Sequence, residues 1–509
     1  MGRVMGGETE WLMPVTNKNR PGADHANFFH DSCRRKDFME RCLPNKYLFS
    51  NVRYRTHSSK IFLRNGARFY FDNTDQLEYA AAEGDGPFAA LVHERAGDLI
   101  TEEAVKGANI WWAEEGYEFR SYKSNLDAVG SCVGFHESYL LNRDTAMRAS
   151  DLIRLFPMLA PHLISRIFYT GNGWVHIDRV AGCLAYSISQ RARVTEQAIS
   201  QSTTLGRGII HTRDEPLGDF EKFRRLHIIC GDSLIAEPAA YLRYAVTDII
   251  LEMIESGFLT DNSCADFVDV GRCFVDAFQR FSGDTELIAT ANFGGKRLTA
   301  VNIQEWYRER AGQYVERRGN ITAEERLTFF LWDKVTAAAK TPKPHEALSS
   351  WVDWAMKKML IEKDMSRRGY DWKCRIAEKP SALGTKQIDE SVMPAYMGAL
   401  MLCKKFAENS PAGYGRKLIA SGAMEKVLMG DEAKRATLMP LPGCRSYARA
   451  LQLCWLQKAA VSLGETFDLD VDWAYTHGKM DGDATYHLFA NPDPRDPNPQ
   501  IPFIKQRIL

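Results

Sequence analysis

The chain has 509 residues, with 65 Lys and Arg side chains against 65 Asp and Glu side chains. A formal net charge of zero argues against a protein that coats nucleic acid or an anionic membrane, because both interactions need a basic surplus. Hydrophobic residues make up 45% of the chain and charged residues 26%, so the composition excludes a disordered protein and allows a large core.

Strand-like runs dominate the first half of the chain and are bounded by Gly and Asn turn signals. Helical periodicity dominates the second half, and a Pro-rich stretch from Asn491 to Phe503 predicts an extended tail. The predicted strands are Lys60–Leu63, Ala67–Asp72, Tyr139–Asn142, Gly208–His211 and Leu226–Cys230, and the clearest predicted helices are Tyr241–Ile254 and Leu348–Lys363. This order indicates an α+β fold with a mainly antiparallel sheet.

Glycines interrupt the helical pattern between residues 415 and 430. We therefore expect a large domain over residues 1–420 and a small C-terminal domain over residues 421–509 that includes the Pro-rich tail.

The cysteines and the N-terminus indicate a reducing compartment, and we expect a cytoplasmic protein. The 11 cysteines are odd in number and contain no C-x-x-C pair, which argues against a disulfide framework or a structural zinc site. The first fifteen residues contain two glutamates and lack the basic start of a signal peptide. The most apolar stretch, Leu152–Ile164, contains Arg154, Pro157 and Pro161 and is too short to span a bilayer.

Two strand-like motifs gather polar side chains on one face. In Gly6–Glu10, alternation places Glu8 and Glu10 together, which suits a hard cation but also suits a solvated edge strand. In Ala67–Asp72, the same period places an arginine, a phenol and a carboxylate on one face and apolar side chains on the other. Such a face binds phosphate and metal, although an amphipathic strand facing water has the same pattern.

A third set adds histidines and arginines. It consists of His136–Glu137, Ser189–Arg191, Thr212–Pro216, Arg224–His227 and Gly231–Asp232. A magnesium nucleotide site needs carboxylates for the ion, arginines for the phosphates and a base for the nucleophile. The chain has no G-x-x-x-x-G-K-[ST] loop, no kinase motifs and no G-x-S-x-G, so any ATP would lie on a sheet lined by Glu and Arg.

With these motifs in order, the chain resembles the Pup ligase and depupylase family, carboxylate–amine ligases with a glutamine-synthetase-like fold. The resemblance spans nearly the whole chain. Its main motifs are G-x-E-T-E at Gly6–Glu10, F-L-R-N-G-A-R-x-Y-x-D at Phe62–Asp72, E-Y-A-x-A-E at Glu78–Glu83, G-x-H-E-x-Y-L at Gly134–Leu140 and R-R-L-H-x-I-x-G-D-S at Arg224–Ser233.

The resemblance implies a catalytic domain with a curved, mainly antiparallel sheet backed by helices. It also implies an enzyme that uses ATP and Mg²⁺ to phosphorylate the C-terminal glutamate side chain of a small, disordered Pup-like protein modifier. A lysine of a target protein then forms an isopeptide bond. The implied residues are Asp72 as the catalytic carboxylate; Arg68, Ala81, Arg213, Arg225 and Trp473 as nucleotide contacts; and Glu8, Tyr70, Glu78, His136 and His227 in the metal and phosphate shell.

The direction of the reaction rests on the first motif. G-G-E-T-E-W is closer to the ligase form than to the start of depupylases, which cleave the conjugate or deamidate the tag. The 51 residues from Trp11 to Ile61 are more than a compact ligase needs and fewer than a full depupylase loop. Ligase is therefore favoured over depupylase or deamidase.

Departures from the family pattern keep two further alternatives open. Ala81 replaces a Thr, Ser138 replaces an Asn, and Leu217-Gly218 replace His-Ala. The alternatives are a ligase with a different tag or amine acceptor, and a paralogue that binds nucleotide or tag without turnover. The basic run Arg34–Lys36 is interpreted as a solvated helix face in preference to a patch that steers an acidic tag.

Overall fold

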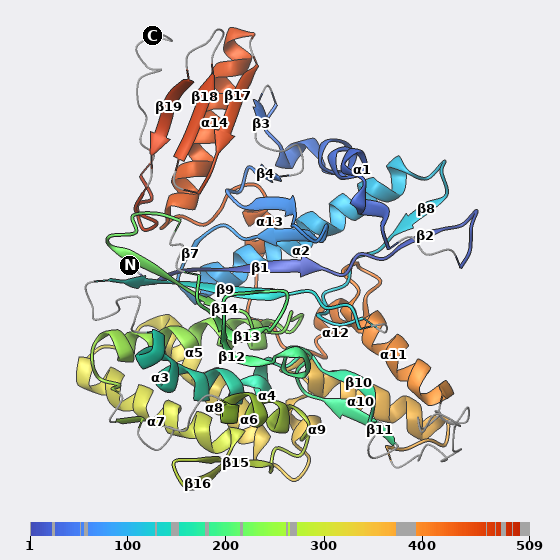
Figure 1. Ribbon diagram of the computed structural model, residues 1–509, viewed down its shortest axis with the longest axis vertical. Coiled ribbons are helices and arrows are strands. Elements are labelled where there is room, and N and C mark those ends of the chain that lie inside the picture. The colour runs from blue at the N-terminus through green and yellow to red at the C-terminus, as the bar shows by residue number, and fades with distance from the viewer. Residues whose placement is uncertain are drawn as a thin grey trace.

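A sheet of nine strands crosses the middle of the protein (Figure 1). The computed structural model describes residues 2–22, 26–50, 52–54, 60–127, 130–143, 152–178, 183–213, 217–260, 263–264, 272–372, 393–464, 466–473, 475–479, 485–490 and 492–498. The strand order is β12 (Gln197–Ser200), β13 (Gly208–His211), β14 (Phe223–Ile228), β9 (Phe135–Asn142), β1 (Val4–Trp11), β6 (Leu77–Ala80), β5 (Arg68–Phe71) and β4 (Lys60–Phe62), with β7 (Gly84–Asp85) beside the start of β1. All pairs are antiparallel except β12 with β13, which agrees with the predicted sheet.

The helices between residues 152 and 420 fill the half of the molecule below this sheet in Figure 1, and the remaining helices lie beside or above it. The two helices nearest the centre, α2 (Pro87–Trp111) and α5 (Glu237–Glu255), pack against each other, and α2 packs on β1. The others are α1 (Ser32–Asp37), α3 (Leu152–Ser165), α4 (Ile167–Thr170), α6 (Arg272–Ser282), α7 (Ala300–Arg318), α8 (Ala323–Ala339), α9 (Pro344–Leu348), α10 (Asp353–Arg367), α11 (Met393–Ala407), α12 (Tyr414–Ala420) and α13 (Glu432–Ala436). None of the helices in these described ranges is long and apolar enough to cross a bilayer.

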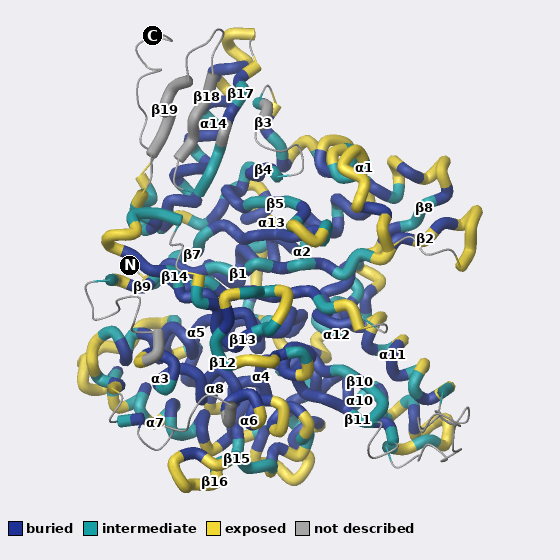
Figure 2. The backbone as a smooth tube through the Cα atoms, in the orientation of Figure 1, coloured by how far each residue is buried: buried dark blue, intermediate teal, exposed yellow. Residues whose placement is uncertain are grey.

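Among the described residues, three two-stranded ribbons lie outside the main sheet. They are β2 (Val15–Asn17) with β8 (Tyr117–Phe119), β10 (Trp174–Asp178) with β11 (Cys183–Ser187), and β15 (Thr290–Phe293) with β16 (Lys296–Thr299). The buried positions follow the sheet and the helices that cover it, whereas exposed positions are concentrated at the loops and the outer helices (Figure 2).

The C-terminal elements stand at one end of the sheet, at the top of Figure 1. Helix α14 (Arg445–Leu463) is followed by β17 (Phe467–Val471), β18 (Tyr475–Lys479) and β19 (Thr485–Ala490), and β3 (Val52–Tyr54) joins their sheet parallel to β17. Buried Leu453 and Leu456 of α14 share a small hydrophobic cluster with Phe49 and Phe62. The division into residues 1–420 and 421–509 stays a prediction.

Several predicted boundaries differ from the structure. The predicted helix Leu348–Lys363 is two helices, because residues 349–352 turn the chain and Val352 is extended before α10 begins at Asp353. The first half also contains the 25-residue helix α2, which the strand-dominated prediction omits. Residues 492–498 of the Pro-rich stretch lie against the protein: the Asp219 amide donates to the Pro492 carbonyl at 2.8 Å.

Candidate active site

The first row of site residues crosses three neighbouring strands. Antiparallel pairing sets Tyr70 of β5 opposite Glu78 of β6, and Glu78 opposite Glu10 of β1. Directly paired residues point to the same face of a sheet, so the phenol and the two carboxylates gather there. Asp72 follows the end of β5, and carboxylate oxygens of Glu10, Asp72 and Glu78 lie within 4.8 Å of one another. The alternation predicted for both motifs thus brings these side chains together.

A second row lies beside the first on the same face. Arg68, Ala80, Glu8 and His136 are successive partners across β5, β6, β1 and β9. The Nδ1 atom of His136 lies 3.3 Å from Glu8 Oε2, and ligand atoms of Glu8, His136 and His227 fall within 4.8 Å of one another. The rings of His136 and His227 are 5.0 Å apart.

A cavity opens next to Glu8 at the end of these rows. Four predicted site residues line it: Glu8, Ala81, Arg225 and Trp473. The Nη1 atom of Arg225 lies 3.4 Å from Glu8 Oε1, and the Ala81 amide donates to the Gly7 carbonyl at 2.9 Å. Glu8, Arg225 and the indole of Trp473 therefore surround one hollow at the sheet, and Glu8 links it to the neighbouring rows of side chains.

The charge environments of Glu8 and Glu78 are opposite. Burial raises the pKa of Glu8, but the hydrogen bond with His136 and the charges of His227 and Arg225 outweigh it and hold that pKa well below its ordinary value. Burial raises the pKa of Glu78 well above its ordinary value, and the negative charges of Glu8 and Glu10 raise it further. Glu78 therefore lacks the positive partner that Glu8 has, and a cation between the carboxylates would supply it.

Four of the five predicted metal residues, all but Tyr70, fall into two sets of possible ligands, and Glu10 and Asp72 complete the set that contains Glu78. The set of Glu10, Asp72 and Glu78 offers only carboxylate oxygens, which suit a hard divalent cation such as Mg²⁺. The set of Glu8, His136 and His227 offers one oxygen and two nitrogens, a mixture that borderline metals prefer. The residues present fit Mg²⁺ at the all-oxygen set.

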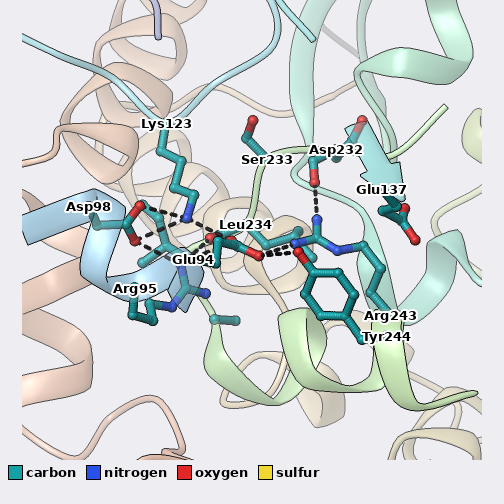
Figure 3. Close-up of polar contacts among 12 residues, drawn as sticks. Glu94, Arg95, Asp98, Lys123, Glu137, Asp232, Ser233, Leu234, Arg243 and Tyr244 are labelled. Atoms are coloured by element: carbon teal, nitrogen blue, oxygen red, sulfur yellow. Dashed lines mark hydrogen bonds and ion pairs between the residues drawn. The ribbon is translucent and has the colours of Figure 1, made fainter. Parts of the chain in front are cut away.

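A polar network supports β1 from the helix side of the sheet (Figure 3). A Cβ on Gly7 would lie 2.4 Å from the hydroxyl of Tyr244, so only glycine allows this close approach next to Glu8. Tyr244 donates to Glu94 Oε2 at 3.0 Å, and Glu94 also accepts from Arg243 at 2.6 Å and from Lys123 at 2.8 Å. The strand that carries Glu8 and Glu10 thus packs on Tyr244, which is hydrogen-bonded to the buried and fully paired carboxylate of Glu94.

Arg213 is the one predicted site residue that the structure leaves at the margin. It lies exposed after β13, outside the residues that line the cavity, and its amide donates to His211 Nδ1 at 3.0 Å. Asp214, Glu215 and Pro216 of the same motif lie outside the described residues.

The predicted set omitted His211, whose ring lies 5.2 Å from that of His227. The pairing of His211 with His227 across β13 and β14 is visible only once the register is known. Glu10 was noted beside Glu8 and completes the all-oxygen set. Arg445 and Arg449 of α14 were also missed, because no local pattern links them to the distant Glu83.

Comparison with known sequences gives a consistent match. The family model described as Pup-ligase protein matches residues 3–380. A Pup–protein ligase of Jonesia denitrificans is 32% identical over 84% of this chain and 85% of its own. A Pup–protein ligase of Acidimicrobium ferrooxidans is 37% identical over 62% of this chain and 67% of its own.

Two solved structures match the fold. The ligase PafA in complex with the prokaryotic ubiquitin-like protein Pup has a TM-score of 0.76 and 25% identity, covering 97% of this chain and 90% of PafA. PafA in complex with ADP has a TM-score of 0.72 and 26% identity, covering 89% and 90%. The fold and the acidic sheet face define an α+β protein of the ligase class, as predicted. The chain belongs to the family of Pup-ligase proteins.

Proposed function

We propose that the protein is an ATP-dependent ligase that joins a Pup-like modifier to lysine side chains of target proteins. The supporting observation is the convergence of Arg68, Tyr70, Asp72, Glu78 and Glu8 on one sheet face beside the cavity. Family membership and the PafA complexes with Pup and with ADP support the same function.

The cavity is the proposed nucleotide site. The indole of Trp473 and the backbone at Ala81 form its walls, and Arg225 faces the phosphates from the Glu8 side. Arg68 lies on the same sheet face, with its guanidinium carbon 5.1 Å from the Tyr70 ring centroid. Arginines at these positions would offset the charge of the transferred phosphoryl group.

Glu10 and Glu78 would hold Mg²⁺, with the phenol of Tyr70 beside Glu78 and the carboxylate of Asp72 next to them as the proposed base. Glu8, His136 and His227 form the adjoining part of the phosphate and metal shell. The ion supplies positive charge that stabilises the phosphoryl oxygens during transfer.

The reaction has two steps. The γ-phosphoryl group passes from ATP to the C-terminal glutamate carboxylate of the modifier, giving an acyl phosphate and ADP. The lysine amine then attacks the acyl carbon, the C–N bond forms and phosphate leaves. Asp72 accepts the proton of the amine, because an ammonium group is no nucleophile.

ADP release with Mg-ATP tests the function. We expect release that depends on a Glu-terminated modifier and on an acceptor protein, together with a lysine-linked product. Cleavage of a preformed conjugate without net ATP consumption would instead identify a hydrolase. Nucleotide binding with neither reaction would identify a binding protein.

A further inference from the structure

Glu83 connects the catalytic sheet to the C-terminal elements through ion pairs with Arg445 and Arg449; these three residues are called the joint. Its carboxylate accepts from Arg445 Nε at 2.8 Å and from Arg449 Nη2 at 2.6 Å. Both arginine side chains are only 3% exposed. The Glu83 carbonyl also accepts from the Ser446 hydroxyl at 2.8 Å. One residue therefore holds the first two turns of α14.

Arg449 extends this joint to the indole of the proposed nucleotide site. Its Nη1 atom donates to the Trp473 carbonyl at 3.0 Å, and its guanidinium carbon lies 4.9 Å from the Trp473 ring centroid. The indole also meets Phe62 of β4 edge to face, with ring centroids 5.2 Å apart, and the Arg449 guanidinium carbon lies 5.1 Å from the centroid of Phe62. Trp473 thus takes its position from Arg449 and Phe62. Arg449 is held in turn by the Glu83 carboxylate and by the Gly66 carbonyl, which accepts from its Nη2 atom at 2.7 Å.

The joint also forms part of the cavity. Glu83, Arg445 and Trp473 all line it, together with Pro494 of the Pro-rich stretch. Pro494 accepts a hydrogen bond from the Arg445 amide at 3.1 Å, so the same helix end holds this wall as well. Glu83 lies two residues beyond Ala81, between the end of β6 at Ala80 and the start of β7 at Gly84.

We propose that Glu83 is a positioning residue for nucleotide binding: by pairing with Arg445 and Arg449 it holds the Trp473 wall against the cavity and so sets the affinity for the nucleotide. The inference rests on the proposed function only in taking this cavity as the nucleotide site. A buried carboxylate shared by two buried arginines fixes geometry more firmly than an exposed pair.

Calorimetric titration of the full chain with Mg-ADP tests the proposal. Glu83→Gln should weaken ADP binding by about tenfold, because it removes the charge that orders both arginines. Glu102→Gln is the matched control. Glu102 is also buried and also shared by two cations, Lys106 and Arg416, but it lies outside the cavity lining. Its loss should leave ADP affinity unchanged, and equal effects of the two variants would overturn the proposal.

A double-mutant cycle with Trp473→Ala separates positioning from general destabilisation. If Glu83 acts through the indole, adding Glu83→Gln to Trp473→Ala should weaken ADP binding much less than tenfold. Additive losses would contradict the proposal, as would unchanged affinity in Glu83→Gln alone. Should Glu83→Gln fail to fold, Arg449→Lys carries the same cycle, because it keeps the charge but loses the paired contacts to Glu83 and Trp473.

The cycle is independent of the ligase reaction. If the wild-type chain binds ADP and forms no conjugate, the proposed function fails while the cycle still decides the role of Glu83. If the wild-type chain does not bind Mg-ADP, the assignment of the cavity fails, and the proposal for Glu83 fails with it.

Discussion

The carboxylate of Asp72 is oriented by the turn that follows β5. It accepts hydrogen bonds from the Thr74 amide at 2.9 Å, from the Thr74 hydroxyl at 2.7 Å and from the Gln76 amide at 2.8 Å. These contacts fix the carboxylate without neutralising it, next to Glu10 and Glu78. A carboxylate held in this way can serve as a base when a lysine amine arrives.

Replacing Asp72 with Asn therefore tests the proposed base at this position. Asp72→Asn should lower the rate of conjugate formation by roughly 10²-fold or more and leave the affinity for ADP nearly unchanged. The measurement is conjugate formed per minute by gel or mass spectrometry, beside ADP titration. Asp75→Asn is the matched control, since Asp75 lies in the same turn but pairs with Arg35. Full activity in Asp72→Asn would remove Asp72 from the mechanism.

Replacing Glu78 should weaken Mg²⁺ binding but raise the stability of the metal-free protein. Glu78→Gln should weaken Mg²⁺ binding roughly 10–100-fold, because it removes an anionic ligand. The same substitution should stabilise the metal-free protein, because Glu78 is buried beside the charges of Glu8 and Glu10. Mg²⁺ titration and urea unfolding without metal measure the two effects. Unchanged Mg²⁺ affinity would place the ion elsewhere.

At the scale of elements, alternation along β1 and β5 predicted which side chains share a face, and β13 matches its predicted range. Period-2 patterns are local, so the sequence is enough to find them. The break between α9 and α10 was not predicted. Asp353, the first residue of α10, accepts hydrogen bonds from the amides of Ile235 and Ala236, and this contact leaves no local pattern in the sequence. Such a contact links segments more than a hundred residues apart.

The joint at Glu83 predicts a response of the C-terminal elements to acid. Burial raises the pKa of Glu83, but Arg449 and Arg445 outweigh burial and hold it at about 2, below the ordinary 4.5. A carboxyl group with a lowered pKa in the folded state contributes stability above about pH 4.5 and loses it as the pH falls toward 2.

The protection factors of the α14 amides, which correct exchange rates for their intrinsic dependence on pH, should therefore fall as the pH falls over this range in the wild-type chain. In Glu83→Gln the protection factors should be lower already at pH 7 and should fall less between pH 4.5 and 2. Identical pH profiles for the two proteins would contradict the role of Glu83 in holding α14.

At the scale of the whole molecule, a buried polar network joins the sheet to its two central helices. Glu94 of α2 binds Arg243 and Tyr244 of α5 and also Lys123 (Figure 3), and its side chain is 1% exposed. Composition gave 65 charges of each sign but could not show which of them are buried. Family motifs predicted the site residues. The Glu94 network and the contacts of Glu83 with α14 could not be predicted, because they depend on tertiary contacts.

Removing the charge of Glu94 should destabilise the entire fold. Glu94→Gln leaves Arg243 and Lys123 short of a buried partner, so the free energy of unfolding should fall by about 3–5 kcal/mol. Urea unfolding monitored by circular dichroism measures this change. Glu118→Gln, at the more exposed pair Glu118–Arg120, should change it by about 0–1 kcal/mol. A loss below about 1 kcal/mol in Glu94→Gln would contradict the supporting role of the network.

The most direct test of the central claim is the intact mass of an acceptor protein after incubation with the chain, Mg-ATP and a Glu-terminated Pup-like modifier. We expect an acceptor heavier by the mass of the modifier less one water, linked at a lysine, with one ADP released per bond. An unmodified acceptor in the presence of bound nucleotide, or a conjugate formed without ADP release, would contradict ATP-dependent ligation.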